Sequence, residues 1–336
     1  MQSDSMYGLA VDIKSGEIIR RKLVDLGLLD NMYAILNDGW HIFFPLVRPD
    51  HEFLKGKQVV EMEFPKRDLK PKTLAESIGF RDVRSFDIIG DIAIIEMPES
   101  ARAQEKKIGE ELLKLNKNIK TVLAKESSVQ GEYRVRGVRL LAGENKTETV
   151  HREHGCRFKV DVSKVYFSPR LSHERGRILS QVKDGEHILA LFSGVAPFPI
   201  VIAKKKRVIA YSIELNPEGH KYALENVKLN KVEGRVIPLL GDVKEILKDD
   251  KFRNWADRII MPLPKDAINF LPFVIHTARK GCIIHVYGFA KKGAEKELGE
   301  HILRLISRPA EIIYSRRVRT YSPDTDQFVF DVKILE

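Results

Sequence analysis

Apolar runs that end in small or acidic residues recur three times in the second half of the chain. The first is Ile188–Leu191, which leads into Phe192–Val195; the second ends at Glu214, and the third ends at Gly241-Asp242. Short apolar runs separated by helical patterns at this spacing predict successive β-α-β units of a parallel sheet. Each strand of such a sheet presents functional groups at its carboxyl end. We therefore expect an α/β domain with a ligand site at these strand ends.

Residues 1–68 predict a small α+β domain. A strand covers Gly8–Ile13, an amphipathic helix covers Gly16–Leu26, and short strands follow up to Phe64. The charged segment Pro65–Pro71 is bounded by prolines and is typical of a linker.

Residues 73–164 predict a second α+β domain. Two strands flank a turn at Gly90-Asp91, a helix covers Glu99–Leu115, and a later strand pair turns at His154-Gly155. The α/β domain then covers residues 165–336.

The composition is that of a folded, heavily charged protein. The 336 residues are 43% hydrophobic and 31% charged, which is enough for two or three domains with separate cores. The sequence has no apolar run of transmembrane length and no signal-peptide pattern, so we expect a cytoplasmic protein that does not bind membranes. Cys156 and Cys282 are expected to be buried thiols rather than a disulfide or zinc ligands. We expect a monomer without a metal site.

The net charge of +10 is concentrated in one region. Residues 131–177 contain eleven Lys or Arg against six Asp or Glu, a balance that favours a phosphate-rich partner such as RNA or DNA. Tyr133, Tyr166 and Phe167 are interleaved with these arginines and could stack on an unpaired base. The alternative is a solvated surface with a local imbalance.

The three strand ends favour S-adenosylmethionine as the ligand. The loop after the first strand has one glycine, Gly194, and matches neither GxGxxG nor GxxxxGK[ST], so it has no phosphate cradle. Glu214 is placed to bind a ribose diol and Asp242 to read an adenine amino group. The alternative is an ordinary α/β core whose loops carry these residues. We predict that the cofactor pocket comprises Phe192, Ser193, Gly194, Val195, Glu214, Leu215, Asp242, Val243 and Pro262.

Several further motifs carry a family resemblance. They are Gly131–Arg136, Leu141–Asn145, Val165–Leu171 with Glu174-Arg175, Phe192–Phe198, Glu225–Asn230, Lys280–His285 and Tyr321–Pro323. In this order they closely resemble the archaeal and eukaryal tRNA guanine-37 N1-methyltransferases. The resemblance spans nearly the whole chain. It implies a Rossmann-like class I S-adenosylmethionine methyltransferase domain preceded by two small α+β domains. The first domain would touch the outer corner of tRNA, and the other two would hold the anticodon stem-loop.

Methylation of guanine N1 has clear chemical requirements. N1 carries a proton at neutral pH, so the reaction needs a base beside N1 and a donor beside O6, where negative charge develops. The resemblance implies that Glu174 is the base and that Arg134 stabilises the charge on O6. The alternatives are an ion pair of Glu174 with Arg170 or Arg177 on the protein surface, and a phosphate contact for Arg134.

Other polar and aromatic residues are candidates for RNA contacts. Tyr166 would stack on a base or position the loop, or else belong to the core. Asn145 would bind the flipped nucleotide or close a turn. The basic run that begins at Arg316 predicts an RNA-facing strand, with a solvated face as the alternative. The predicted RNA-binding residues are Arg136, Asn145, Tyr166, Pro264, Lys265, Arg316 and Arg317.

Two positions depart from the family pattern. Ala190 stands where members that make only 1-methylguanosine usually carry an acid, and Pro262-Leu263-Pro264 stands where they carry Asn-Leu-Pro. These segments resemble an archaeal branch that also methylates C7 of 4-demethylwyosine, the tricyclic intermediate of wyosine synthesis. We therefore expect a tRNA methyltransferase that acts on N1 of guanosine 37, with C7 methylation of 4-demethylwyosine as a candidate second activity. The alternatives are another S-adenosylmethionine-dependent RNA-modifying enzyme and a non-catalytic tRNA-binding paralogue.

Overall fold

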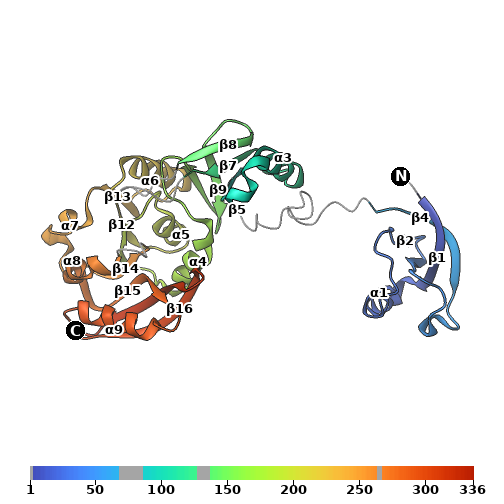
Figure 1. Cartoon of the computed structure of the whole chain (residues 1–336). Helices are drawn as coiled ribbons and strands as arrows, with labels where there is room; N and C mark the ends of the chain where they lie inside the picture. Colours follow the sequence, from blue (N-terminus) through green and yellow to red (C-terminus); the bar gives the residue numbers. More distant parts are fainter. Residues whose placement is uncertain (1–2, 68–85, 127–136, 263–266) are drawn as a thin grey trace. The chain divides into compact units, whose positions relative to one another are not determined.

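The computed structural model describes residues 3–67, 86–126, 137–262 and 267–336. The chain forms two compact units, Met1–Ser77 and Ile78–Glu336 (Figure 1).

The first unit is a four-stranded antiparallel sheet with one main helix. Its elements are β1 (Ser3–Asp12), η1 (Ile13–Ser15), α1 (Gly16–Asp25), β2 (Leu36–Asn37), β3 (His41–Pro45), η2 (Glu52–Leu54) and β4 (Val59–Pro65). The strand order is β2-β3-β1-β4. Leu23 of α1 and Leu9 of β1 are fully buried in a small core of its own. Gly8 allows close packing at the centre, because a Cβ there would lie 2.5 Å from the Phe64 ring. The predicted elements are present, and β1 begins five residues earlier than expected.

The second unit begins with a mixed four-stranded sheet in the order β5-β6-β7-β8. Its elements are β5 (Phe86–Ile89), β6 (Ile92–Ile95), η3 (Glu99–Gln104), α3 (Glu105–Leu115), β7 (Thr121–Lys125) and β8 (Val138–Gly143). The predicted Gly90-Asp91 turn joins β5 and β6, and Gly90 has a φ of +58°. All four residues of β6 are buried, as the apolar run predicts.

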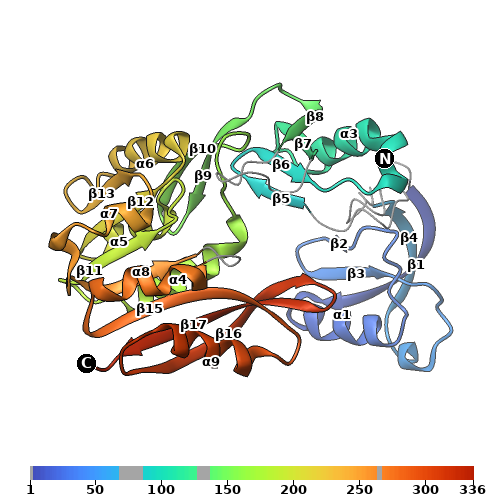
Figure 2. The same ribbon diagram turned by 60° about the vertical axis from the view of Figure 1, so that its left-hand side comes forward.

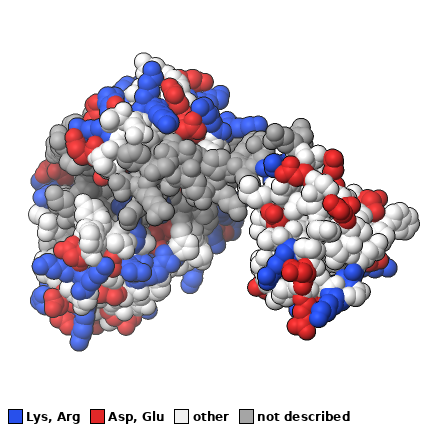
Figure 3. Space-filling model, turned by 45° about the vertical axis from the view of Figure 1, so that its right-hand side comes forward, with Lys and Arg blue, Asp and Glu red and all other residues white. Residues whose placement is uncertain are grey.

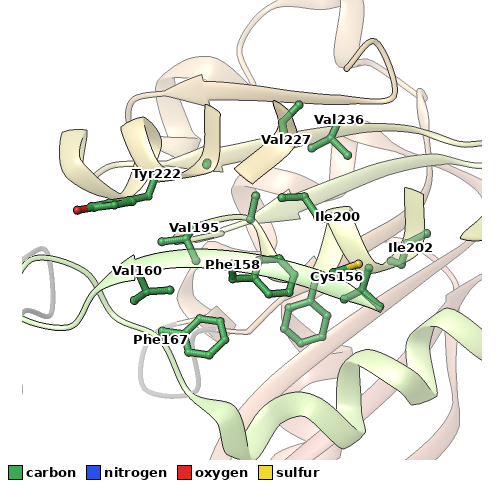
Figure 4. Close-up of a cluster of buried hydrophobic side chains, with 14 of the residues drawn as sticks. Cys156, Phe158, Val160, Phe167, Val195, Ile200, Ile202, Tyr222, Val227 and Val236 are labelled. Atoms are coloured by element: carbon green, nitrogen blue, oxygen red, sulfur yellow. The ribbon is translucent and has the colours of Figure 1, made fainter. Parts of the chain in front are cut away.

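A β-hairpin connects this sheet to the larger one. Strands β9 (Glu148–Glu153) and β10 (Cys156–Asp161) pair antiparallel around His154-Gly155. Both turn residues have positive φ, which is the requirement of a type I′ turn, so the predicted turn is confirmed. Figure 4 shows Cys156, Phe158 and Val160 of β10 among the buried side chains of the larger domain.

Two asparagines of a helix complete the hydrogen bonds of this hairpin. Helix α6 (Pro217–Asn230) presents Asn226, whose amide donates to the Lys159 carbonyl and accepts from the Lys159 N–H. Asn230 makes the same two bonds to Arg157. Both asparagine side chains are buried, and they take the place of a neighbouring strand for this backbone edge. The Glu225–Asn230 motif is thus explained by packing of α6 against β10.

A seven-stranded sheet forms the rest of the unit. Its elements are η4 (Pro169–Leu171), α4 (Ser172–Gln181), β11 (His187–Leu191), α5 (Pro197–Lys205), β12 (Ile209–Glu214), α6, β13 (Val236–Leu240), α7 (Val243–Ile246), η5 (Asp250–Phe252), β14 (Ala256–Met261), η6 (Ala267–Phe270), α8 (Leu271–Val274), η7 (Ile275–Thr277), β15 (Ala278–Lys291), α9 (Glu295–Leu305), β16 (Ala310–Ser322) and β17 (Thr325–Ile334). The order is β13-β12-β11-β14-β15-β17-β16. The first five strands are parallel; β17 is antiparallel to β15, and β16 is antiparallel to β17 (Figure 2). The predicted Rossmann-like sheet is confirmed.

The sheet is covered on both faces, which explains its continuous apolar strands. One core contains Ile188 and the helices α5 and α6, and the other contains Leu189 and the helices α8 and α9. The first core also contains residues of β10 and parts of β5, β6 and β7. The expected second and third domains therefore share a core, and a boundary at residue 164 stays a prediction.

Two further features concern the chain as a whole. None of the helices in the described ranges is long and apolar enough to span a membrane. Cys156 and Cys282 are free and buried, as predicted.

Candidate active site

The loop between β11 and α5 has an unusual backbone. Phe192, Gly194 and Ala196 all adopt left-handed conformations, with φ of 54°, 55° and 63°. Positive φ is uncommon for residues with a Cβ, and such strain is concentrated at functional sites. A Cβ at Gly194 would lie 3.3 Å from the Tyr166 carbonyl oxygen, so the loop passes close to the segment that leads into α4.

The end of β12 contacts this loop directly. The Gly194 N–H donates to Glu214 Oε2 at 2.6 Å, and the Asn216 N–H donates to Oε1 at 2.8 Å. Burial raises the pKa of Glu214 and outweighs the backbone hydrogen bonds, which lower it. Each carboxylate oxygen can accept a further hydrogen bond from a ligand. Ser193 is buried, and its Oγ accepts from the Ser212 hydroxyl at 2.8 Å.

The other predicted cofactor residues lie at neighbouring strand ends. Asp242 follows β13 and caps α7, where its Oδ1 accepts from the Lys244 N–H at 2.8 Å. Asp242 is exposed, whereas Val243 is buried. Leu215 follows β12 and Pro262 follows β14, and both are half-buried. The structure thus brings the predicted residues to one edge of the sheet, where the parallel strands β11, β12, β13 and β14 end.

Glu174 lies on α4 and is only 1% exposed. Its Oε2 accepts from Arg177 Nε at 2.9 Å and from the Tyr287 hydroxyl at 2.9 Å. Its Oε1 accepts from Arg316 Nη2 at 2.6 Å. The ion pair with Arg177 that the helical spacing suggested is therefore present, but it is buried rather than on the surface. Arg170, the other candidate partner, pairs with Asp87 instead.

The strand register places Glu174 beside the edge of the sheet where the parallel strands end. Val286 of β15 pairs with Met261, the last residue of β14. Tyr287 is one residue further along β15, so its hydroxyl holds Glu174 beside the carboxyl ends of the parallel strands. Burial, together with the Glu174 carboxylate, raises the pKa of Tyr287 well above its usual range. The Tyr287 hydroxyl therefore keeps its proton and acts as a donor.

A chain of buried polar groups holds Arg177 from behind. Asp331 of β17 accepts two hydrogen bonds from the Arg177 guanidinium, at 2.5 and 3.1 Å, and a third from His285 Nδ1 at 2.6 Å. Burial would raise the pKa of Asp331, but the hydrogen bonds from His285 and Arg177 hold it well below its usual range. The arginine side chain is therefore fixed by an ionised carboxylate.

His285 is neutral in this chain of groups. Burial lowers its pKa despite the neighbouring Asp331 carboxylate. Arg258 Nη1 lies 2.8 Å from His285 Nε2 and can only donate, so Nε2 accepts and Nδ1 carries the proton that is donated to Asp331. Arg258 in turn pairs with Glu186 at 2.7 Å.

The predicted RNA-binding residues occupy different settings. Tyr166 is half-buried before α4, and Asn145 is exposed between β8 and β9. Arg317 is exposed and lies 3.6 Å from Asp326, whereas Arg316 reaches Glu174. The remaining candidates lie outside the described residues; they are Arg134, Arg136, Pro264 and Lys265.

The sequence analysis gave no individual role to Asp331, Tyr287 or His285. A signal for Asp331 was present, because it is the one acid within the apolar run Phe328–Val332. A lone acid in a buried strand requires a partner, but the sequence does not show which one.

Comparison with known proteins identifies the relatives of this fold and site. Residues 149–314 match the TRM5/TYW2 methyltransferase domain, residues 71–147 the TYW2 N-terminal domain, and residues 8–54 the tRNA methyltransferase 5 N-terminal domain. The chain is 41% identical to tRNA (guanine(37)-N(1))-methyltransferase Trm5b of Pyrococcus abyssi, in an alignment that covers 96% of this chain and 98% of that protein. The chain belongs to the TRM5/TYW2 methyltransferase family. The predicted family membership is confirmed.

Solved structures of family members match nearly the full length of the chain. The crystal structure of Trm5b from Pyrococcus abyssi has a TM-score of 0.82 at 40% identity and covers 98% of this chain and 100% of its own. A complex of aTrm5 with tRNALeu has a TM-score of 0.76 at 32% identity and covers 97% and 99%. A relative named for two substrates, guanine-37 and 4-demethylwyosine, also matches. The guanine-37 and 4-demethylwyosine methyltransferase Taw22 of Nanoarchaeum equitans is 36% identical, over 70% of this chain and 92% of its own length.

Proposed function

We propose that this protein transfers a methyl group from S-adenosylmethionine to N1 of guanosine 37 in the anticodon loop of tRNA. The observation that carries the proposal is the buried carboxylate of Glu174, fixed by three donors at the edge of the sheet where the parallel strands end. The proposal is supported by the name of the relative that is 41% identical over nearly the full length, and by the tRNA in the complex of aTrm5.

The strand ends fit S-adenosylmethionine. Gly194 lets the loop backbone approach a ligand closely, and Glu214 has lone pairs left to accept hydrogen bonds from a ribose diol. Asp242 uses one oxygen for its helix cap and would offer the other to the adenine amino group. When bound, S-adenosylmethionine supplies an electrophilic methyl group. Two solved relatives from Methanocaldococcus jannaschii are complexes, one of Trm5 with adenosine and one of TYW2 with S-adenosylmethionine.

Glu174 would act as the general base. Its carboxylate would take the proton from guanine N1 and leave an electron pair on N1 to accept the methyl group. The bond between the methyl carbon and the sulfonium sulfur would break, with S-adenosylhomocysteine as the leaving product. Arg134 remains our candidate for stabilising the charge on O6. Tyr166, Asn145, Arg136, Pro264, Lys265, Arg316 and Arg317 remain proposed RNA contacts. We further infer that the protein works in the cytoplasm as a monomer; free buried thiols suit a reducing compartment.

The test is methyl transfer from labelled S-adenosylmethionine to matched tRNA transcripts with guanosine or adenosine at position 37, followed by nucleoside analysis. We expect 1-methylguanosine from the first transcript and no product from the second. Equal labelling of both would overturn the assignment of the target. Binding of tRNA without binding of S-adenosylmethionine would instead support the non-catalytic alternative.

A second substrate, 4-demethylwyosine, is favoured by one observation. Pro262 follows β14 where an asparagine is expected for enzymes that make only 1-methylguanosine, and a side chain that could hydrogen-bond the target base is absent at this position. A relative named for both substrates is 36% identical. The same assay with tRNA that carries 4-demethylwyosine at position 37 tests this activity; unchanged nucleoside would exclude it.

A further inference from the structure

Arg316 contacts the proposed base from a position that also faces solvent. It lies on β16, and 37% of its side chain is exposed, although its partner Glu174 is almost completely buried. Its Nη2 donates to Glu174 Oε1 at 2.6 Å, and its Nη1 donates to His173 Nε2 at 3.0 Å. Its Nε is shielded from water and has no hydrogen-bond partner among the described residues. This guanidinium is therefore incompletely satisfied where it stands.

The other two donors to Glu174 cannot leave it. Arg177 is 10% exposed and its guanidinium is held by Asp331 through two hydrogen bonds. Tyr287 is fully buried within β15. Arg316 is thus the one donor, among the described residues, that can swing away from the carboxylate without opening the core.

If Glu174 is the general base, Arg316 must move away from its carboxylate. Hydrogen bonds from the three donors occupy both carboxylate oxygens. A general base must have an oxygen within hydrogen-bond reach of the proton that it removes. Departure of Arg316 would free Oε1 to accept that proton.

A phosphate group is the ligand that would draw Arg316 away. The planar guanidinium forms paired hydrogen bonds with phosphate oxygens as well as with carboxylates. We propose that Arg316 is a positioning residue that holds Glu174 in the free enzyme and passes to a backbone phosphate of the bound tRNA. Binding of the correct RNA thereby exposes the base. This inference rests on the proposed function, in which Glu174 accepts the N1 proton.

The exchange makes Glu174 and RNA competitors for one arginine. Replacing Glu174 by Gln weakens its hold on Arg316, so Glu174→Gln should bind tRNA about tenfold more tightly than wild type, or about 1.4 kcal/mol. The gain should vanish in Glu174→Gln/Arg316→Ala and persist in Glu174→Gln/Arg317→Ala. Arg317 is the matched control because it is the next residue of β16 and pairs with Asp326 instead. Equilibrium binding of guanosine-37 tRNA without S-adenosylmethionine measures these affinities.

Two outcomes would overturn the proposal. One is an unchanged or weaker tRNA affinity of Glu174→Gln; the other is a gain that survives in the Arg316→Ala background, which would reflect charge removal alone. Arg316→Lys is a second variant, which keeps the positive charge. In an Arg316→Lys background, Glu174→Gln should still tighten tRNA binding, by about half as much on a logarithmic scale as in the wild-type background. Single-turnover rates separate this inference from the proposed function: a Glu174→Gln enzyme with a wild-type rate would remove Glu174 as the base, while the binding cycle would still report whether Arg316 is exchanged.

Discussion

Glu174 is a carboxylate that the fold both buries and pairs with charge. The resemblance indicated its role, and helical spacing indicated its pair with Arg177, but neither pointed to Tyr287 or Arg316 as donors to it. Those residues follow Glu174 by more than a hundred positions, and only the pairing of distant strands brings them to α4. Site residues that lie at one strand end or on one helix could therefore be predicted from the sequence. Contacts between residues on separate strands could not.

Removal of the Tyr287 hydroxyl should slow the chemical step. Tyr287→Phe keeps the buried ring and deletes one of three donors that orient Glu174, so we expect the single-turnover rate to fall about tenfold with tRNA affinity unchanged. Tyr222→Phe is the control, because it removes a similar hydroxyl-to-carboxylate bond, to Glu148, at the hairpin. Equal losses in both variants would mean that the effect is general destabilisation rather than positioning of Glu174.

Another buried pair gives a prediction for acid stability. Arg175 donates to both oxygens of Glu153. Burial would raise the pKa of Glu153, but His151 and Arg175 lower it from its usual 4.5 to about 2. A depressed pKa stabilises the folded state above the unfolded pKa, and this stability is lost as pH falls from about 4.5 towards 2.

Glu153→Gln should remove that dependence. The difference in unfolding free energy between wild type and variant should be constant above about pH 5 and shrink between pH 4.5 and 2, as measured by denaturant titration at each pH. A difference that stays the same across this range would show that the carboxylate charge does not stabilise the fold.

The start of helix α6 can be recognised from the sequence, but the contacts of its side chains cannot. Asn216 followed by Pro217 is a helix start, and in the structure the Asn216 side chain caps α6 by accepting from the Glu218 N–H. The Asn-Pro pair is a local signal, and so is the His154-Gly155 turn, which the sequence analysis predicted. The contact between Asn226 and β10 was not predictable, since an asparagine within a helix gives no indication of which backbone it will pair with.

This contact should make a measurable contribution to stability. Asn226→Ala would leave the N–H and the carbonyl of Lys159 without their partner, and each unsatisfied buried group costs about 1–3 kcal/mol. We expect the unfolding free energy of the larger unit to fall by about 3 kcal/mol in urea titrations. Asn118→Ala, at an exposed site, serves as the control. A loss below about 0.5 kcal/mol for Asn226→Ala would contradict the proposed role of α6.

The two units of the molecule have different proposed roles. Every predicted cofactor residue lies in Ile78–Glu336, and the first unit has its own core around Leu9, Leu23 and Phe44. Lys and Arg side chains are interspersed with Asp and Glu on the face drawn in Figure 3. Several cations of the larger unit form ion pairs, such as Arg139 with Glu105. The net charge of +10 indicates that the protein binds an anionic molecule. The sequence does not show which Lys and Arg side chains already pair with Asp or Glu; the structure does.

A chain that begins at Ile78 should retain the cofactor site. We expect its affinity for S-adenosylmethionine, measured by calorimetry, to stay within about twofold of the full chain, because units with separate cores fold separately. Affinity for full-length tRNA should fall, and affinity for an isolated anticodon stem-loop should not. A large loss of cofactor affinity in a folded truncated chain would place part of the site in the first unit.

The single-turnover rate of Glu174→Gln with tRNA bound tests the account most directly. Guanosine-37 tRNA and S-adenosylmethionine are both supplied at saturating concentrations, so that the rate reports methyl transfer alone. Loss of a general base predicts a rate lower by about 10²–10⁴-fold. A Glu174→Gln enzyme that forms 1-methylguanosine at the wild-type rate would show that the buried carboxylate has a structural role and does not take part in the reaction.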